Sequence, residues 1–243
     1  MHSEICKLGP LTVYSYGLML LLAFAAAAFL AGAQARKKGI DPDIIFNLCF
    51  TVFISGIAGA RIFYVFLNFS YYLNNPLEII MLQKGGLAWF GGLVCGVLSG
   101  IYYLKTKKLS VLGVSDLLVP YVALAQAIGR LGCFLNGCCY GRESAFGIYF
   151  PSADAVLIPT QLYSSLILVL IFIILRVLQE RPRREGAIFF AYLLLYPAKR
   201  FLIEFWRADS PRLALGLTLF QLISIAIFLI ALVSLYRINT KKS

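Results

Sequence analysis

Long apolar runs, separated by short clusters of basic residues, divide the sequence into about seven segments. The runs cover approximately residues 11–34, 44–67, 85–104, 116–135, 161–178, 186–206 and 215–236. Each is close to the roughly 20 residues that a helix needs to cross a bilayer. Periodicity alone does not separate spanning helices from buried ones, so run length and flanking charge decide. The pattern predicts an all-α polytopic membrane protein with about seven transmembrane helices.

The composition agrees with this class. Hydrophobic residues make up 60% of the 243 residues and charged residues 14%, and the mean hydropathy is +0.84. Soluble domains carry about 25% charged residues. The spans leave no room for a separate soluble domain, so we expect residues 1–243 to form a single integral membrane domain.

The net charge of +11 follows the topology. The cations lie in short clusters between apolar runs rather than along one polar face, so we expect no nucleic-acid partner. Alternate loops differ in their Lys and Arg content, and the richer side is cytoplasmic. This predicts a cytoplasmic C-terminus and an N-terminus outside. The richer side holds Arg36, Lys37, Lys38, Lys105, Lys107, Lys108, Arg181, Arg183, Arg184, Arg237, Lys241 and Lys242, and the other side Lys7, Lys84, Arg142, Arg207 and Arg212.

The stretch GRLGCFLNGCCYG, residues 129–141, places polar groups where the fourth apolar run ends. Arg130 keeps its charge in any environment, and near a bilayer that charge costs about 2.5–3.5 kcal/mol. We therefore expect it to meet an anion. Glycine is unfavourable inside a helix but lets the backbone approach a ligand closely. We interpret the stretch as a helix that breaks over a polar cavity, because non-helical backbone at membrane depth needs protein or water around it.

The sixth run ends in a second charged set. Arg200, Glu204 and Arg207 are spaced by four and three residues, so they share one helical face. One interpretation is an internal salt-bridge ladder. The other is an anion site to which Arg130 and Arg61 also converge, because the planar fork of arginine suits phosphate. We favour the anion site, since ionisable residues inside a membrane are candidates for function by default.

Three of the six cysteines, Cys133, Cys138 and Cys139, lie in the 129–141 stretch. Adjacent Cα atoms are about 3.8 Å apart, too close for an unstrained Cys138–Cys139 disulfide. In an oxidising compartment, a disulfide from Cys133 to either Cys138 or Cys139 is the open alternative. The only histidine is His2, and three thiols lack the fourth ligand of a structural zinc site. We therefore expect no metal and no cofactor, and we interpret most of the cysteines as small side chains that fill space beside a cavity.

Four further features predict local structure. Asp116 begins the fourth run and is expected to cap that helix. Residues 68–84 predict an interfacial loop or a short surface helix, and residues 140–160 a polar loop. Small residues recur at intervals of four in the third run, which predicts close helix packing: Gly92, Gly96 and Gly100.

Because no nucleophile elbow, HExxH pair or Walker loop is present, hydrolysis by a protein nucleophile is unsupported.

Motifs along nearly the whole chain resemble those of the prolipoprotein diacylglyceryl transferases. In order they are YSYGLM, GARIFY, GGLAWFGG, VSD, GRLGCFLNGCCYG, PTQLY and the segment 200–207. The resemblance implies a bacterial inner-membrane enzyme with seven spans and its N-terminus outside. Such enzymes move the diacylglyceryl group of phosphatidylglycerol onto the lipobox cysteine thiol of a preprolipoprotein. The products are a thioether and glycerol 1-phosphate.

The resemblance also implies site residues. Arg130 and Arg200 match the family's key arginines, and Glu204 belongs to the same sixth-span motif, so we expect these three to be catalytic. The implied substrate-binding residues are Tyr16, Arg61, Tyr64, Phe90, Asn136, Gly141, Gln161 and Arg207.

The chain departs from the family pattern at three positions. Phe90 stands where histidine is most frequent, and Ile158 and Ser164 stand where histidine and glutamate are frequent. No imidazole base is then available within the membrane, and Tyr64 or a water is the open candidate for accepting the thiol proton. A thiol pKa near 8.5 already leaves a few per cent of thiolate at neutral pH, and guanidinium groups increase that fraction.

The departures motivate one alternative function, a non-catalytic lipid-binding paralogue. A small anion transporter ranks last, because such folds show broken helices in both halves and the sequence shows one obvious break.

Overall fold

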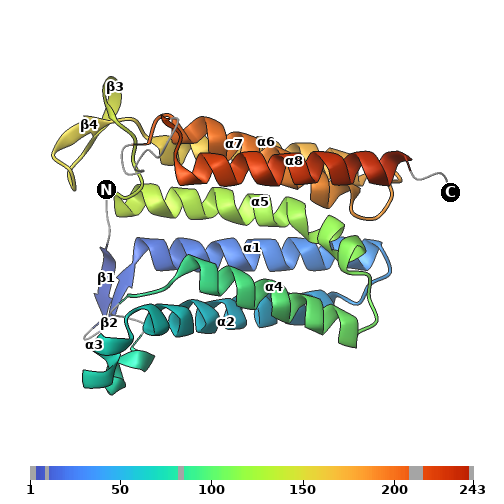
Figure 1. The fold of residues 1–243 in the computed structure, drawn as a ribbon, viewed down its shortest axis with the longest axis horizontal. Helices are drawn as coiled ribbons and strands as arrows, with labels where there is room; N and C mark the ends of the chain where they lie inside the picture. Colours follow the sequence, from blue (N-terminus) through green and yellow to red (C-terminus); the bar gives the residue numbers. More distant parts are fainter. Residues whose placement is uncertain (1–3, 9–10, 82–84, 208–215, 241–243) are drawn as a thin grey trace. The chain divides into compact units, whose positions relative to one another are not determined.

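The computed structural model describes residues 4–8, 11–81, 85–207 and 216–240. Helices make up most of this chain (Figure 1). The elements in order are β1 Glu4–Leu8, β2 Leu11–Tyr14, α1 Ser15–Lys37, α2 Pro42–Leu67, α3 Phe69–Asn74, the 3-10 helix η1 Pro76–Ile80, α4 Trp89–Thr106, α5 Val111–Asn136, β3 Glu143–Phe150, β4 Ala155–Leu157, α6 Thr160–Gln179, α7 Ala187–Glu204 and α8 Leu219–Thr240.

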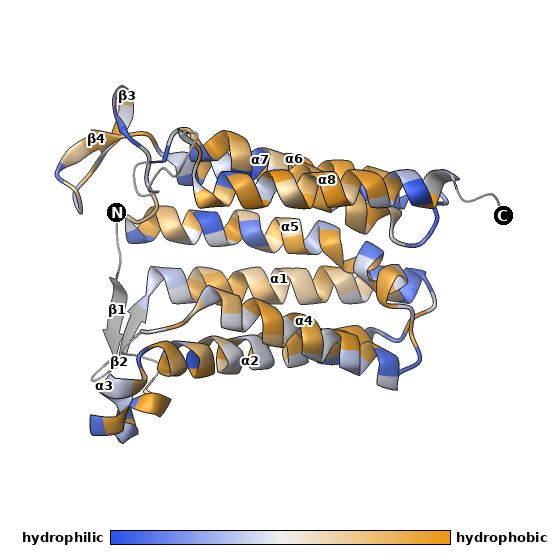
Figure 2. Ribbon diagram, viewed as in Figure 1, coloured by the Kyte–Doolittle hydropathy of each residue, from blue (hydrophilic) through white to orange (hydrophobic). Residues whose placement is uncertain are grey.

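Within the described residues, five helices are long and apolar enough to cross a membrane: α1, α2, α5, α6 and α8. Figure 2 shows apolar residues along most of each of them. Large side chains such as Phe29 and Phe66 are 71% and 72% exposed, as hydrocarbon surroundings allow. The all-α membrane class is thus supported. Helices α4 and α7 coincide with predicted runs but have 18 residues each and are not among the five.

The chain divides into two compact units, residues 1–31 with 115–243, and residues 32–114. That residues 1–243 form a single domain stays a prediction. In the first unit, α7 packs against both α6 and α8. Helices α5, α6 and α7 share a core of buried side chains: Val119, Ala123, Ala127, Leu168, Ile171, Leu175, Ile188 and Tyr192.

Polar bonds cross this apolar core. The Ser165 hydroxyl on α6 donates to the Ala127 carbonyl of α5 at 2.9 Å. The Tyr192 hydroxyl on α7 donates to the Gln126 side chain of α5 at 2.9 Å. Bonds of this kind between membrane helices contribute about 0.6–2 kcal/mol each. They fix how α6 and α7 lie on α5, and therefore where the ends of these helices meet.

Asp116 caps a helix, but not its own. Helix α5 begins at Val111, so the expectation that Asp116 caps the start of the fourth run is wrong. Its carboxylate, buried with 6% exposure, accepts the backbone N–H groups of Gly186 and Phe189 at 2.7 Å each. These groups belong to the first turn of α7, which has no partners of its own for them. The capping role of Asp116 was predicted correctly, but the helix that it caps, α7, is distant from it in the sequence.

In the second unit, α2 and α4 lie side by side. A Cβ atom added at Gly59 would lie 2.4 Å from the Cβ of Cys95, and one at Gly91 would lie 2.5 Å from the Gly59 carbonyl oxygen. Only glycine allows this approach. The predicted small-residue face also meets α2, which confirms its packing role: Gly92, Gly96 and Gly100.

Two connecting segments differ in how well they were predicted. In residues 68–84, α3 and η1 confirm the short helix. The 140–160 segment was predicted as a loop but contains the β3–β4 hairpin, in which Tyr149 pairs with Val156. Two short strands give little periodic signal, and the paired N-terminal strands β1 and β2 were missed for the same reason. Outside the described residues lie His2, Lys84, Arg212, Lys241 and Lys242.

Replacing Asp116 with asparagine is expected to destabilise the protein. The amide removes the charge that two buried N–H groups share, at a cost of about 2 kcal/mol. The midpoint of thermal unfolding in detergent should fall by roughly 4–8 °C. Glu180→Gln, at an exposed position after α6, is the control and should melt like the wild type. Equal melting of the two variants would contradict the capping role.

Candidate functional site

The 129–141 stretch ends helix α5 and then reverses the chain. The helix continues through Gly129 and Gly132 and stops at Asn136. The predicted break therefore lies near the end of the stretch. Gly137 and Cys139 follow with φ of 70° and 65°, in the left-handed region that tight reversals require. The reversal brings the two later cysteines back toward the last turns of α5.

Side chains hold the three successive carbonyls of this turn. Ser152 Oγ donates to the Gly137 carbonyl at 2.9 Å. Gln161 Nε2 donates to the Cys138 carbonyl at 2.6 Å, and Thr160 Oγ1 to the Cys139 carbonyl at 2.8 Å. Thr160 and Gln161 form the first turn of α6 and are almost fully buried. The turn is therefore rigidly positioned against the start of α6.

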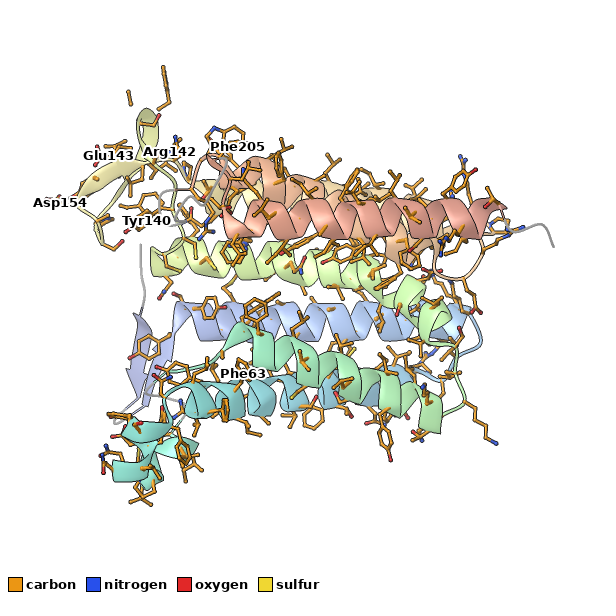
Figure 3. The ribbon with its side chains drawn as sticks, viewed as in Figure 1. Phe63, Tyr140, Arg142, Glu143, Asp154 and Phe205 are labelled. Atoms are coloured by element: carbon orange, nitrogen blue, oxygen red, sulfur yellow. The ribbon has the colours of Figure 1, made fainter. Side chains whose placement is uncertain are left out.

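Gly141 joins the turn to α6 and α7. A Cβ atom there would lie 2.6 Å from the Trp206 carbonyl oxygen, so only glycine fits. Its N–H donates to the Ile158 carbonyl at 2.9 Å, and the N–H of Arg142 donates to the Trp206 carbonyl at 2.9 Å. Figure 3 shows Arg142 and Phe205 at this end of the first unit. The end of α7 is thereby fixed against the 129–141 stretch.

Glu204 is the centre of an ion-pair group in the last turns of α7. Its side chain is fully buried, and Oε2 lies 3.0 Å from Arg200 Nη2 and 4.0 Å from Arg207 Nε. Oε1 accepts a hydrogen bond from Thr218 Oγ1 at 3.1 Å. The Arg200 guanidinium also stacks on the Phe220 ring, 4.6 Å from its centroid. The salt-bridge ladder, which the spacing allowed as the alternative to an anion site, is present, with two guanidinium groups on one carboxylate.

Arg130 adds positive charge to this group. It is half-buried on α5, and its charge acts on Arg200 and Lys199 of α7 and on Cys139 of the turn. Arg200 and Arg207 contact the Glu204 carboxylate, and Arg130 lies close enough to act electrostatically on Arg200. The surplus of positive charge in a largely dry setting is what an anion site requires.

Lys199 is a site residue that sequence reasoning missed. It is 3% exposed, its Nζ donates to Ser164 Oγ at 2.8 Å, and it lies 4.9 Å from the centroid of the Tyr196 ring. No carboxylate pairs with it among the described residues. Two features of the sequence could have indicated Lys199 as a site residue. It lies next to Arg200, and its partner Ser164 stands where the family often has glutamate.

The three thiols of the stretch come together. The sulfur atoms of Cys133, Cys138 and Cys139 all lie within 4.8 Å of one another, and none forms a disulfide. Hydrogen bonds from Cys133 and Cys138, with the positive charges of Arg207 and Arg130, hold the pKa of the Cys139 thiol below its usual value. The cluster is thus an electron-rich group facing the arginines.

Tyr16 and Gln161 also border the stretch. A Cβ atom at Gly132 would lie 3.5 Å from the Tyr16 ring and 2.9 Å from the Met19 Cβ, so this glycine lets the start of α1 approach α5. The side-chain oxygen of Gln161, Oε1, is buried and has no hydrogen-bond partner among the described residues. Asn136 is exposed at the end of α5. Because Gln161 Oε1 has no partner among the described residues, it can accept a hydrogen bond from a ligand at the site.

The remaining predicted residues belong to the second unit. Arg61 is 6% exposed, and all three of its guanidinium nitrogens donate to backbone carbonyls, including that of Ile79 at 2.8 Å and that of Gly86 at 2.9 Å. It holds the segment before α4. Tyr64 lies against Gly86, and Phe90 is 53% exposed. That these three contact a substrate stays a prediction.

Replacing Glu204 with glutamine is expected to lower stability strongly. Removing one partner of a buried ion pair leaves uncompensated charge on Arg200 and costs about 3–5 kcal/mol. Thermal unfolding in detergent measures this loss. The control is Glu143→Gln, an exposed carboxylate on β3, which should melt like the wild type. A Glu204→Gln variant as stable as wild type would mean that the carboxylate does not hold the two arginines.

Comparisons with known proteins give this arrangement a family. A sequence model described as prolipoprotein diacylglyceryl transferase matches residues 3–237. The protein named phosphatidylglycerol–prolipoprotein diacylglyceryl transferase from Streptococcus pyogenes serotype M5 (strain Manfredo) is 37% identical over 246 residues, covering 97% of this chain and 95% of the relative. Its counterpart from serotype M49 (strain NZ131) matches to the same extent. The chain therefore belongs to the prolipoprotein diacylglyceryl transferase family.

Proposed function

We propose that this protein transfers the diacylglyceryl group of phosphatidylglycerol to the lipobox cysteine thiol of a preprolipoprotein. A thioether forms and glycerol 1-phosphate leaves. The observation that carries the proposal is that Arg200 and Arg207 share the one buried carboxylate of Glu204 while Arg130 acts electrostatically on Arg200, so that among the described residues cations outnumber the carboxylate at this place. The names of the relatives point to the same reaction.

The arginines bind the phosphate of the lipid. Arg130 on α5 and Arg200 on α7 supply planar donors that suit two phosphate oxygens. Glu204 orients Arg200 by its 3.0 Å contact and keeps Arg207 near. Asn136 and the free Oε1 acceptor of Gln161 supply polar contacts for the glycerol headgroup. One carboxylate positions the arginines without neutralising all of them.

An apolar groove beside the arginines suits an acyl chain. It has a volume of about 310 Å³ and lies between α7 and α8. The hydroxyl of Ser224, its one polar side chain, is already bonded to the Phe220 carbonyl at 2.7 Å. The lining residues include Pro197 and Leu202, which flank Arg200 on α7. A lipid whose phosphate meets Arg200 would therefore find hydrocarbon contact within one or two helical turns.

The chemistry is displacement at a glycerol carbon. The acceptor thiolate attacks the carbon bonded to the phosphate ester oxygen, and the C–O bond breaks with its electrons on the phosphate. Arg130 and Arg200 stabilise the charge that gathers there, which is electrostatic stabilisation of a leaving group. Holding lipid and peptide in one site supplies the rest through proximity. Tyr64 or a water accepts the thiol proton.

The proposal includes the topology of an inner-membrane enzyme. Helices α4 and α7 join the five candidate spans to make seven, with the N-terminus outside and the C-terminus in the cytoplasm. The excess of Lys and Arg in alternate loops supports this orientation. The ends of α5 and α7 then face outward, where a translocated lipoprotein precursor presents its cysteine. Phosphatidylglycerol enters sideways between helices, and Tyr16, Arg61, Tyr64 and Phe90 complete the substrate contacts.

Arg130→Ala is expected to reduce diacylglyceryl transfer by about 100-fold or more, because loss of one donor to a developing charge has that scale. The assay follows a labelled diacylglyceryl group from phosphatidylglycerol to a synthetic lipobox peptide with purified protein. A peptide with Ser in place of Cys should accept nothing. Arg181→Ala, in the exposed loop after α6, is the matched control.

Full transfer by Arg130→Ala at equal protein abundance would refute this account of the site. Wild-type protein that binds phosphatidylglycerol but transfers nothing would instead identify the non-catalytic paralogue. In that case Phe90→His is the variant to test next.

Lys199→Met is expected to raise the KM for phosphatidylglycerol about tenfold, the effect of losing roughly 1.4 kcal/mol of attraction to the phosphate. Its melting temperature should stay at the wild-type value or rise, because the ammonium is buried without a carboxylate partner. Lys105→Met, an exposed position in the last turn of α4, controls for net charge. Lower stability with unchanged KM would assign Lys199 a purely structural role.

A further inference from the structure

We propose that Cys133, Cys138 and Cys139 bind one zinc ion, and that the ion takes the acceptor thiol of the lipoprotein precursor as its fourth ligand. The second half of this inference rests on the proposed transferase function. The first half concerns the thiols alone and stands independently of it.

The geometry of the thiols is close to what zinc needs. The three sulfur atoms lie within 4.8 Å of one another. Zinc–sulfur bonds of about 2.3 Å in tetrahedral arrangement put ligand sulfurs about 3.8 Å apart. Small side-chain rotations therefore suffice to close the sulfurs around an ion. A disulfide would use two of the sulfurs and leave the third without a role.

The backbone that carries the thiols is fixed in advance. Ser152, Gln161 and Thr160 hold the carbonyls of residues 137, 138 and 139. The Cys138 thiol donates to the Cys133 carbonyl at 3.6 Å. Contacts of this kind orient metal ligands and tune the ion in known sites. Such support is more than cysteines that merely fill space would require.

The charges also match. Three thiolates and one Zn²⁺ leave one negative charge, which would be unfavourable in an apolar setting. Arg130 and Arg207 both act electrostatically on Cys139 and offset this charge. The same arginines attract the lipid phosphate in the proposed reaction. The metal and the phosphate site would therefore be adjacent.

The number of ligands distinguishes a catalytic from a structural ion. The sequence disfavoured zinc because three thiols lack a fourth ligand. Within the described residues, no His, Asp or Glu joins the three cysteines. Three protein ligands and one open position are, however, the pattern of catalytic zinc. The cysteines are half-buried, so a peptide thiol has access from solvent.

The ion would supply the activation of the thiol for which no imidazole is available within the membrane. A thiol that coordinates zinc is deprotonated, and its proton passes to water. The bound sulfur attacks the glycerol carbon, the C–O bond to phosphate breaks, and the phosphate leaves with the bonding electrons. The product is a neutral thioether, which binds zinc weakly and dissociates. No oxidation or reduction occurs.

Metal binding is measured first, without any transfer assay. Purified protein is loaded with zinc, desalted and analysed for metal content, and competition with a chromophoric chelator gives the affinity. Wild type and Cys49→Ala, a thiol on α2, should retain one zinc per chain. Cys133→Ser and Cys138→Ser should each lose at least tenfold in affinity, with melting temperatures confirming that they fold. Equal retention by all variants, no retention by wild type, or a wild-type disulfide that blocks loading would overturn the inference.

Cobalt substitution then tests the fourth ligand. The sulfur-to-cobalt charge-transfer band of the loaded protein should intensify when a lipobox peptide with cysteine is added, and should not respond to the serine peptide. An unchanged band would refute coordination of the acceptor. Full transfer by metal-free protein would leave the transferase function intact and remove zinc from it, so the two proposals fail separately.

Discussion

Keeping several cations in an apolar helix bundle requires a counter-charge at the place where they lie, and Glu204 provides it. Its fully buried carboxylate contacts Arg200 and Arg207 and accepts a hydrogen bond from Thr218. Removing such a partner exposes the whole desolvation cost of the charges that remain. The end of α7 therefore has one stable arrangement, and the neighbouring elements fit to it.

The 129–141 stretch depends on that arrangement. Gly141 lies so close to the Trp206 carbonyl that no side chain fits, and the N–H of Arg142 bonds to the same oxygen. The first turn of α6 holds the preceding carbonyls. Arg130, Cys139 and Arg200 are thus kept near one another by contacts to the backbone of the turn and of α7's end, from glycine, from a backbone N–H and from the side chains of Thr160 and Gln161. This explains why glycines and charged residues occur together in the stretch.

The sequence predicted the features that depend on local spacing. The apolar runs located the helices, and glycines at intervals of four predicted close helix packing. Spacings of four and three placed Arg200, Glu204 and Arg207 on one helical face. It failed where the partner is distant along the chain. Asp116 caps α7 instead of its own helix, and Lys199 meets Ser164, 35 residues away. The two β-hairpins were not predicted, because short strands show little hydrophobic periodicity. The resemblance, not the pattern, led to Gly141 and Gln161.

One position where this chain departs from the pattern of the family it resembles, Ser164, changes the electrostatics of the site. With serine at position 164, the carboxylate frequent in the family is absent, and the ammonium of Lys199 occupies the neighbourhood. Glu204 contacts Arg200 and Arg207, and the charge of Arg130 acts on both Arg200 and Lys199. Such surroundings favour thiolate over thiol and phosphate over neutral ligands. A site with this much positive charge depends less on a strong base, because the electrostatic field of the cations stabilises the thiolate that a base would generate.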